Sequence, residues 1–214
     1  MGLFQWFWET DDPYGEMELM TSRDSVTWQR LRPRRPFLAR TPGGPAVGAF
    51  DGQVVDTALS PPVRINRAST METLSFYYWG GPAMHGNRHL THGRGIGMAQ
   101  LRADGFCSLQ ARRFPGTIVT KPLTWPGGTL SLNFSVLGGA GNGGVQTEVL
   151  HEDLSPVEGL ARADADVMRG DGTRITQTWH GDARAIERVR GQRVCLKFYV
   201  DNAGLFSFRA VPEA

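Results

Sequence analysis

The sequence has almost no helix signal. Among its 214 residues, only residues 182–190 form a helical pattern longer than two turns, and that pattern is weak. Most of the remaining chain alternates apolar and polar residues, or runs through β-branched and aromatic ones, and 27 glycines and 13 prolines interrupt it. Frequent turns between short strands are typical of an all-β protein.

The sequence is also poor in cysteine. Cys107 and Cys195 are its two cysteines, too few for a disulfide scaffold in a chain of this length. Both follow apolar residues in expected strands, so we expect buried thiols, and a disulfide between them stays open. Neither has a histidine near it in sequence, which argues against a nucleophilic thiol.

Long apolar runs and a strong charge of one sign are absent as well. No stretch reaches the ~20 apolar residues of a membrane span, and we expect no membrane partner. The start, MGLFQWFWETDD, lacks the basic residues and the cleavage site of a secretion signal, which leaves localisation open. The net charge of +2 argues against nucleic acid. The arginine-rich run 30–35 reads as a solvated loop, with an anionic partner as the alternative.

The expected strands fall into two groups. Before a turn at Asp104-Gly105 the loops are long, and after it strands and turns alternate about every ten residues, as in a β-sandwich. We therefore predict two domains, 1–104 and 105–214. The expected strands are 4–9, 16–21, 26–30, 53–57, 73–79 and 95–102, then 106–111, 116–123, 129–137, 145–151, 174–179, 193–200 and 205–210.

The turn Ser22-Arg23-Asp24-Ser25 joins two of these strands into a hairpin. Asp24 is expected to bind the turn backbone as a structural residue. Ser25 stands where such turns often need positive φ, which costs roughly 1 kcal/mol for a residue with a side chain. Glu16 and Glu18 alternate with Met17 and Leu19, so they are expected to face solvent or a neighbouring blade.

The segment "SRDSVTW" (22–28) resembles the blade hairpins of the five-bladed β-propeller glycoside hydrolases of the arabinanase/fructosidase-like group, glycosyl hydrolase family 32/43-type. "RRPFL", "FDGQVV", "LSFYYWGG" and "RGIGMAQLRADGFCSL" look like its last blade. "GTIVTKPLTWPGGTLSLNFSV" through "GQRVCLKFYVDNAGLFSFRA" is similar to the β-sandwich that often follows the propeller in bacterial members. The resemblance implies partial propeller blades over 1–104 and a β-sandwich over 105–214.

The segment before the sandwich is too short for five blades of four strands each. The chain looks like the last third of a propeller, and the catalytic carboxylates of the group lie mainly on the earlier blades. We therefore predict no catalytic residue, and whether the chain is an enzyme stays open. The expected function is a glycoside-hydrolase-like protein that acts on or binds carbohydrate. The alternatives are a non-catalytic carbohydrate-binding or interaction module, and a homo-oligomer in which several chains complete a propeller.

Glycoside hydrolysis uses two carboxyl groups on either side of one bond. The best carboxylates are Glu9, which follows Trp8 at a strand end, and Asp51 in a glycine-rich loop. Aromatic rings stack on the apolar faces of sugars, which makes Tyr78 and Trp79 candidate platforms, with core packing as the alternative.

The loop that follows these aromatics carries His85, His89 and His92 among glycines. Metal binding is disfavoured because Gly86 and Gly93 argue against a helix, so no metal or cofactor is expected. The resemblance places His85 in the central pocket, and an ordinary hydrogen-bonded loop histidine is the alternative. Arg88 is a candidate donor to sugar hydroxyls. The predicted substrate-binding residues are Trp8, Glu9, Asp51, Tyr78, Trp79, His85 and Arg88.

Overall fold

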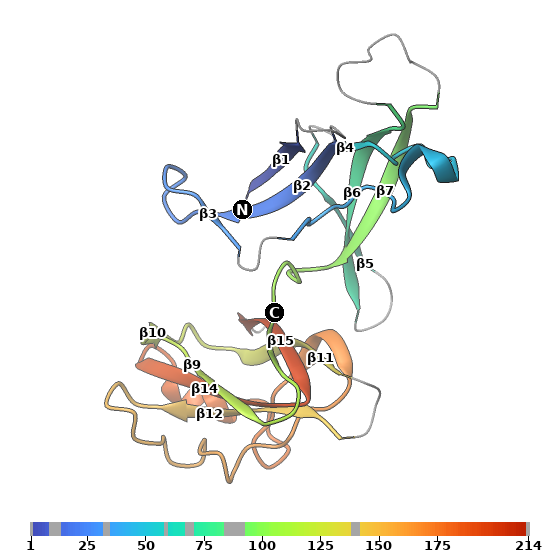
Figure 1. Cartoon of the computed structure of the whole chain (residues 1–214). Helices are drawn as coiled ribbons and strands as arrows, with labels where there is room; N and C mark the ends of the chain where they lie inside the picture. The colour runs from blue at the N-terminus through green and yellow to red at the C-terminus, as the bar shows by residue number, and fades with distance from the viewer. Residues whose placement is uncertain are drawn as a thin grey trace. The chain divides into compact units, whose positions relative to one another are not determined.

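The computed structural model describes residues 2–8, 14–31, 35–57, 60–66, 71–83, 93–137 and 142–212. The protein is all-β, as the sequence predicts (Figure 1). The described residues include two 3₁₀ helices, η1 (Gly44–Val47) and η2 (Ala185–Val189), and η2 lies within the weak helical pattern at 182–190. The strands of the first half of the chain are β1 (Gly2–Trp8), β2 (Tyr14–Thr21), β3 (Gln29–Arg30), β4 (Val54–Thr57), β5 (Val63–Asn66), β6 (Glu72–Gly81) and β7 (Gly95–Arg102).

The chain divides into two compact units. Met1–Arg64 and Leu74–Leu101 form the N-terminal unit, and Ile65–Thr73 and Arg102–Ala214 form the C-terminal unit. The strands of the second half are β8 (Leu109–Ala111), β9 (Gly116–Val119), β10 (Leu123–Thr124), β11 (Thr129–Val136), β12 (Gly144–Leu150), β13 (Asp171–Thr176), β14 (Arg193–Asp201) and β15 (Ala203–Val211).

Strands β1 to β7 form one open sheet in the described part of the chain. Its order is β1-β2-β4-β6-β5, with β3 added to β2 and β7 added to β6. The β1–β2 ladder is antiparallel over seven residue pairs. By contrast, β2 and β4 are parallel and share only the pair Gly15 and Val54. The sheet therefore consists of two antiparallel groups of strands joined at one point.

The hairpin predicted around residues 22–25 is present. Met20 and Thr21 of β2 pair with Arg30 and Gln29 of β3, and Ser25 has φ 61°. Asp24 Oδ1 accepts hydrogen bonds from the backbone nitrogens of Val26 (2.9 Å) and Thr27 (2.7 Å). These bonds hold the pKa of Asp24 well below its usual value, because they favour the carboxylate. The structural role expected for Asp24 is confirmed.

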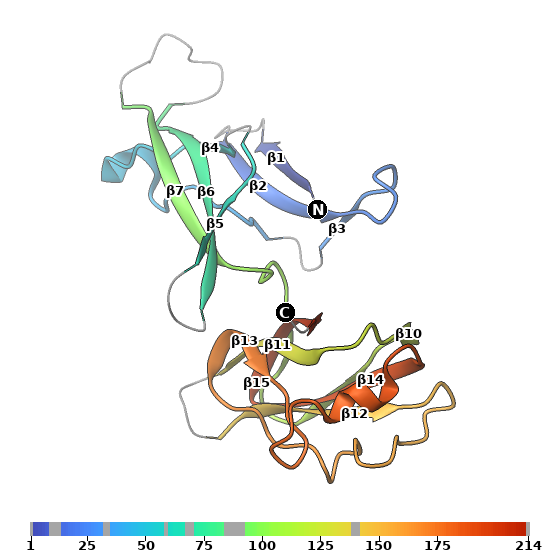
Figure 2. The same cartoon turned by 180° about the vertical axis from the view of Figure 1, so that it is seen from behind.

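The C-terminal unit contains two four-stranded antiparallel sheets. One has the order β10-β14-β12 with β9 added to β14, and the other has the order β13-β11-β15-β8 (Figure 2). Alternate residues of β11 and β14 contribute to one apolar cluster, among them Leu130, Leu132, Phe134, Leu196 and Phe198, each at most 1 % exposed. Burying each of these side chains contributes about 1.5–3 kcal/mol to folding, so this cluster holds the two sheets together.

Three details differ from the sequence predictions. Glu18 is only 9 % exposed, so of the two positions expected for it, solvent or a neighbouring blade, the solvent-facing one is wrong. Cys107 is an exposed free thiol rather than a buried one, because it precedes β8 instead of lying in a strand; Cys195 is buried and also free. Strand β5 (Val63–Asn66) lies between the expected strands 53–57 and 73–79, where the sequence predicted no strand.

Candidate functional site

Asp51 is the predicted site residue with the most clearly defined surroundings. It lies in the loop between η1 and β4 and is 7 % exposed. Its Oδ1 accepts a hydrogen bond from the Thr41 hydroxyl at 2.6 Å, and its Oδ2 accepts one from the Tyr78 hydroxyl at 2.8 Å. Two of the predicted site residues are therefore in direct contact. Both oxygens of the carboxylate are engaged by hydroxyl groups of the protein itself.

Tyr78 is packed as well as hydrogen-bonded. Its ring stacks on Phe50 with 6.0 Å between ring centroids. Burial and the hydrogen bond to the Asp51 carboxylate raise the pKa of Tyr78 to about 12, because both favour the neutral phenol. Gly97 on β7 leaves room for this ring, since a Cβ there would lie 2.3 Å from Tyr78 Cζ. Gly97 therefore allows the Tyr78 ring to pack closely against β7.

Trp79 points to the other face of β6 from Tyr78, as neighbouring strand residues do. The Arg94 guanidinium lies over the Trp79 ring, 5.2 Å from its centroid. Trp79 is partly buried and Arg94 is exposed. The structure therefore places the two predicted aromatic platforms on opposite faces, so they do not form one surface.

The remaining predicted residues cannot be placed at this site. The backbone of Trp8 pairs with Tyr14 at the end of β1, and its side chain lies outside the described residues. Glu9, His85 and Arg88 also lie outside them, as do His89 and His92. Within the described ranges, no group of three or more His, Cys, Asp or Glu side chains is placed to hold a metal ion.

The C-terminal unit carries a hollow that the sequence predictions missed. Its volume is about 500 Å³, and its lining includes Thr117, Gln146, Arg162, Arg169, Tyr199 and Asp201. We call it the β14 hollow. The ladders pair Tyr199 with Gln146 on one side and with Thr117 on the other. These three residues thus form one row across β12, β14 and β9. Phe198 and Val200 beside Tyr199 are buried in the core, so the row lies on the outer face of the sheet.

The segment that connects β12 to β13 forms one wall of the β14 hollow. Gln146 Nε2 donates hydrogen bonds to the backbone oxygens of Arg162 (3.0 Å) and Ala165 (2.7 Å). Glu148 Oε1 accepts a bond from the Arg162 backbone nitrogen at 3.3 Å. Two side chains of β12 therefore attach this segment to the sheet and set the position of Arg162.

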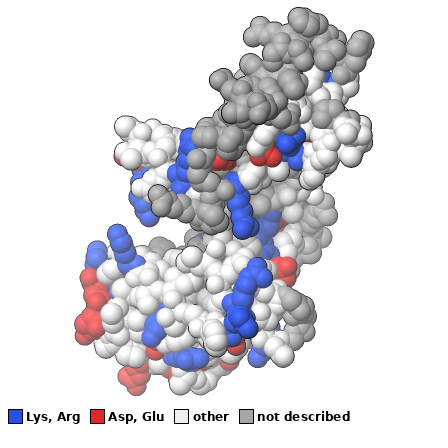
Figure 3. All heavy atoms as spheres, viewed as in Figure 1, with Lys and Arg blue, Asp and Glu red and all other residues white. Residues whose placement is uncertain are grey.

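Charged side chains of both signs are interspersed on the face of the molecule in Figure 3, in keeping with the low net charge. In the parts of the chain that the structure describes, no helix has the length and apolar character needed to cross a membrane. Comparison with known protein families, curated proteins and solved structures finds no match for this chain.

Proposed function

We propose that this protein binds carbohydrate without hydrolysing it, through a β-sandwich that follows two propeller-like blades. This proposed plan is that of the end of an arabinanase/fructosidase-like glycoside hydrolase, which the sequence resembles. The observation behind the absence of hydrolysis is that both carboxylate oxygens of Asp51 are hydrogen-bonded within the protein, and the observation behind binding is the polar β14 hollow. The two Asp51 oxygens accept hydrogen bonds from Thr41 and Tyr78 at 2.6 and 2.8 Å, and Asp51 is 7 % exposed.

Hydrolysis of a glycosidic bond needs a carboxyl group that reaches the bond and a second one across it. Asp51 is one of the two best carboxylates of the sequence, and its burial and bonding give it a structural role. Binding needs no such pair. It needs polar donors and acceptors at a concave surface, and the β14 hollow supplies these through Thr117, Arg162 and Asp201.

Two features of the strands support the proposed architecture. The strands of the first sheet fall into two antiparallel groups that share only the parallel pair between β2 and β4, and we assign these groups to two neighbouring blades. Two antiparallel sheets around one apolar cluster have the plan of a β-sandwich.

The test is retention of the full chain on immobilised plant and microbial polysaccharides, with release of reducing sugar from the same polysaccharides as a second measurement. We expect retention on at least one polysaccharide and no release of sugar. Release of reducing sugar would favour the hydrolase, and absence of retention on every polysaccharide would overturn the proposal.

A second candidate is assembly of several chains into a complete propeller. Gln100 Nε2 donates to Ser75 Oγ at 3.4 Å, which places the alternate residues Tyr77, Ile96 and Met98 on one face of β6 and β7. Their exposed fractions are 46 %, 78 % and 52 %. An apolar sheet face of this kind suits a second copy of the chain. Sedimentation as a monomer at high concentration would exclude this candidate.

A further inference from the structure

The β14 hollow contains two arginines without an acidic partner. Arg162 Nε donates to Gln146 Oε1 at 3.4 Å, and Arg169 Nη1 donates to the backbone oxygen of Gly143 at 3.2 Å. Among the described residues, neither guanidinium forms an ion pair with a carboxylate. Both side chains are exposed and keep donors free for a ligand in the hollow.

Arg162 is held in place before any ligand arrives. Its guanidinium carbon lies 4.1 Å from the centroid of the Tyr199 ring, and the Tyr199 hydroxyl donates to Glu148 Oε2 at 2.7 Å. Glu148 also binds the Arg162 backbone nitrogen at 3.3 Å. A fixed guanidinium loses less conformational entropy on binding than a free one, so its hydrogen bonds to a ligand contribute more to affinity.

The charges of the hollow match a ligand with one negative charge. Arg162 and Arg169 contribute two positive charges and Asp201 one negative charge, which leaves one positive charge. The nearby Lys197 lies 3.6 Å from Glu148 Oε2, so that pair cancels. A guanidinium binds a carboxylate through two parallel hydrogen bonds. The carboxylate of Asp201 disfavours groups of higher charge, such as phosphate.

From this geometry we propose that the β14 hollow binds the carboxylate of a uronic acid unit in an acidic polysaccharide. Arg162 and Arg169 bind the carboxylate, and Thr117 and Asp201 bind the hydroxyl groups of the sugar. This inference rests on the proposed carbohydrate function and adds the chemical class of the sugar. The volume of about 500 Å³ lies within the range of sites for small molecules.

The test is calorimetric titration of the full chain with tri-galacturonate and, separately, with its methyl ester, which has the same backbone and no charge. We expect the acid to bind at least about tenfold more tightly than the ester. Arg162→Gln and Arg169→Gln should each weaken binding of the acid by about tenfold and leave the ester unchanged.

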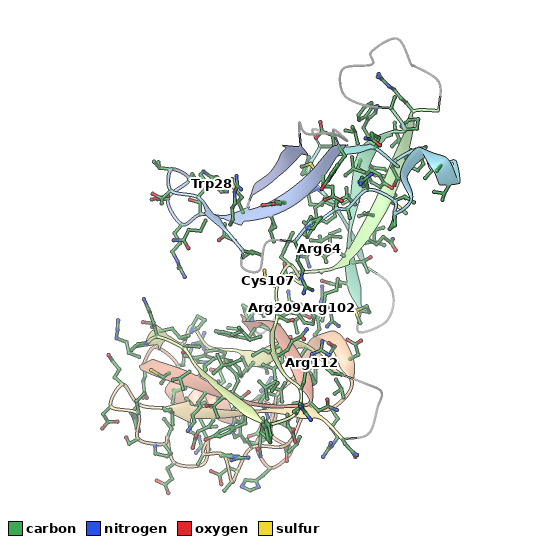
Figure 4. All side chains as sticks on the ribbon, viewed as in Figure 1. Trp28, Arg64, Arg102, Cys107, Arg112 and Arg209 are labelled. Atoms are coloured by element: carbon green, nitrogen blue, oxygen red, sulfur yellow. The ribbon has the colours of Figure 1, made fainter. Side chains whose placement is uncertain are left out.

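Arg209→Gln is the matched control, because Arg209 is an exposed arginine on β15, in the other sheet of the same unit (labelled in Figure 4). It should leave the affinity for the acid unchanged. Circular dichroism of each variant checks that the fold is intact. A loss of affinity in Arg209→Gln equal to that in Arg162→Gln would overturn the assignment to the β14 hollow.

The outcomes separate this inference from the proposed function. If acid and ester bind equally, and the two hollow variants change nothing, the carbohydrate function stands and the uronate site is overturned. If neither saccharide binds and no polysaccharide retains the chain, both proposals are overturned. Titration with inorganic phosphate is the third arm, and binding of phosphate alone, lost in Arg162→Gln, would replace the sugar with a simple anion.

Discussion

The Tyr78 hydroxyl donates a 2.8 Å hydrogen bond to Asp51 Oδ2 and connects β6 to the loop before β4. The 26 residues between them include strands β4 and β5, so this bond joins two parts of the N-terminal unit that are far apart in sequence. It leaves the Asp51 carboxylate with a hydrogen-bond donor at each oxygen. Predictions on stability and on pH follow from this contact.

Tyr78→Phe should destabilise the N-terminal unit. It removes one of the two donors to a buried carboxylate, and leaving such a group short of a donor costs about 1–3 kcal/mol. Urea unfolding measured by fluorescence gives the change in free energy. Tyr77→Phe is the matched control, since Tyr77 is the adjacent tyrosine and is 46 % exposed. Equal effects of the two substitutions would contradict the structural role of the bond.

The same bond predicts a stability loss at alkaline pH. The pKa of Tyr78 is raised from 10.0 to about 12 in the folded protein. The unfolded chain therefore releases this proton at a lower pH than the folded chain does. The contribution to stability is fully present below pH 10 and is lost as the pH rises from 10 to about 12.

Urea unfolding from about pH 9 to about pH 11.5 measures this loss. The wild-type chain should lose more stability over this range than Tyr78→Phe, because the variant has no phenol to titrate at this position. In absorbance titration, the phenolate component with its midpoint near 12 should be missing from the variant. Parallel stability curves for the two proteins would show that Tyr78 does not titrate differently on folding.

Ser25→Gly should stabilise the β2–β3 hairpin. Ser25 has φ 61°, a conformation that is unfavourable for a residue with a Cβ, while glycine adopts it freely. The gain is about 0.5 kcal/mol, because glycine also adds entropy to the unfolded chain. Ser25→Ala keeps the Cβ and is the control, with no gain expected. Thermal unfolding compares the two, and a higher midpoint for Ser25→Ala than for Ser25→Gly would contradict the explanation.

Most of the correct predictions from the sequence were based on local patterns. The alternation in 129–137 and 193–200 marked β11 and β14 because every second residue there enters the core. The residues Ser22 to Ser25 marked the turn because Asp24 binds backbone groups only two and three residues away. Both features depend on residues that are close together in sequence, so the sequence alone was enough to predict them.

The contacts missed by the sequence predictions depend on strand order. Thr117, Gln146 and Tyr199 meet in the β14 hollow because β9 and β12 both pair with β14, and their sequence separations give no sign of it. Asp51 and Tyr78 were both candidate site residues, but their hydrogen bond follows from the fold of the N-terminal unit. Glu18 is buried although its strand alternates charged and apolar residues, because the alternation does not show whether the second face of the strand is covered.

The two buried tryptophans of the C-terminal unit differ in one hydrogen bond, so substituting each in turn measures how much that bond contributes to stability. Trp179 and Trp125 are each 1 % exposed. Trp179 Nε1 donates to the Thr147 backbone oxygen at 3.1 Å, whereas Trp125 Nε1 has no partner among the described residues. Trp179→Phe should therefore cost about 1–2 kcal/mol more than Trp125→Phe in urea unfolding. A larger loss for Trp125→Phe would contradict the assigned bond.

The two free thiols should differ in accessibility. Cys107 is exposed, while Cys195 is 2 % exposed on β14. Cys107 also lines an apolar hollow of about 350 Å³ with Ile118, Phe198 and Phe208, and burial raises the pKa of its thiol. A chromogenic aromatic disulfide should therefore modify one thiol per folded chain and two per unfolded chain.

The thiolate is the reactive form, so Cys107 should react more slowly than free cysteine at neutral pH, and its rate should rise with pH. Cys107→Ser is the control, because the folded variant should then release no chromophore within the same time. Cys195→Ser should keep the full reaction of the folded chain. Rapid reaction of the folded Cys107→Ser variant would mean that the reagent reaches Cys195, in contradiction to its exposure of only 2 % on β14.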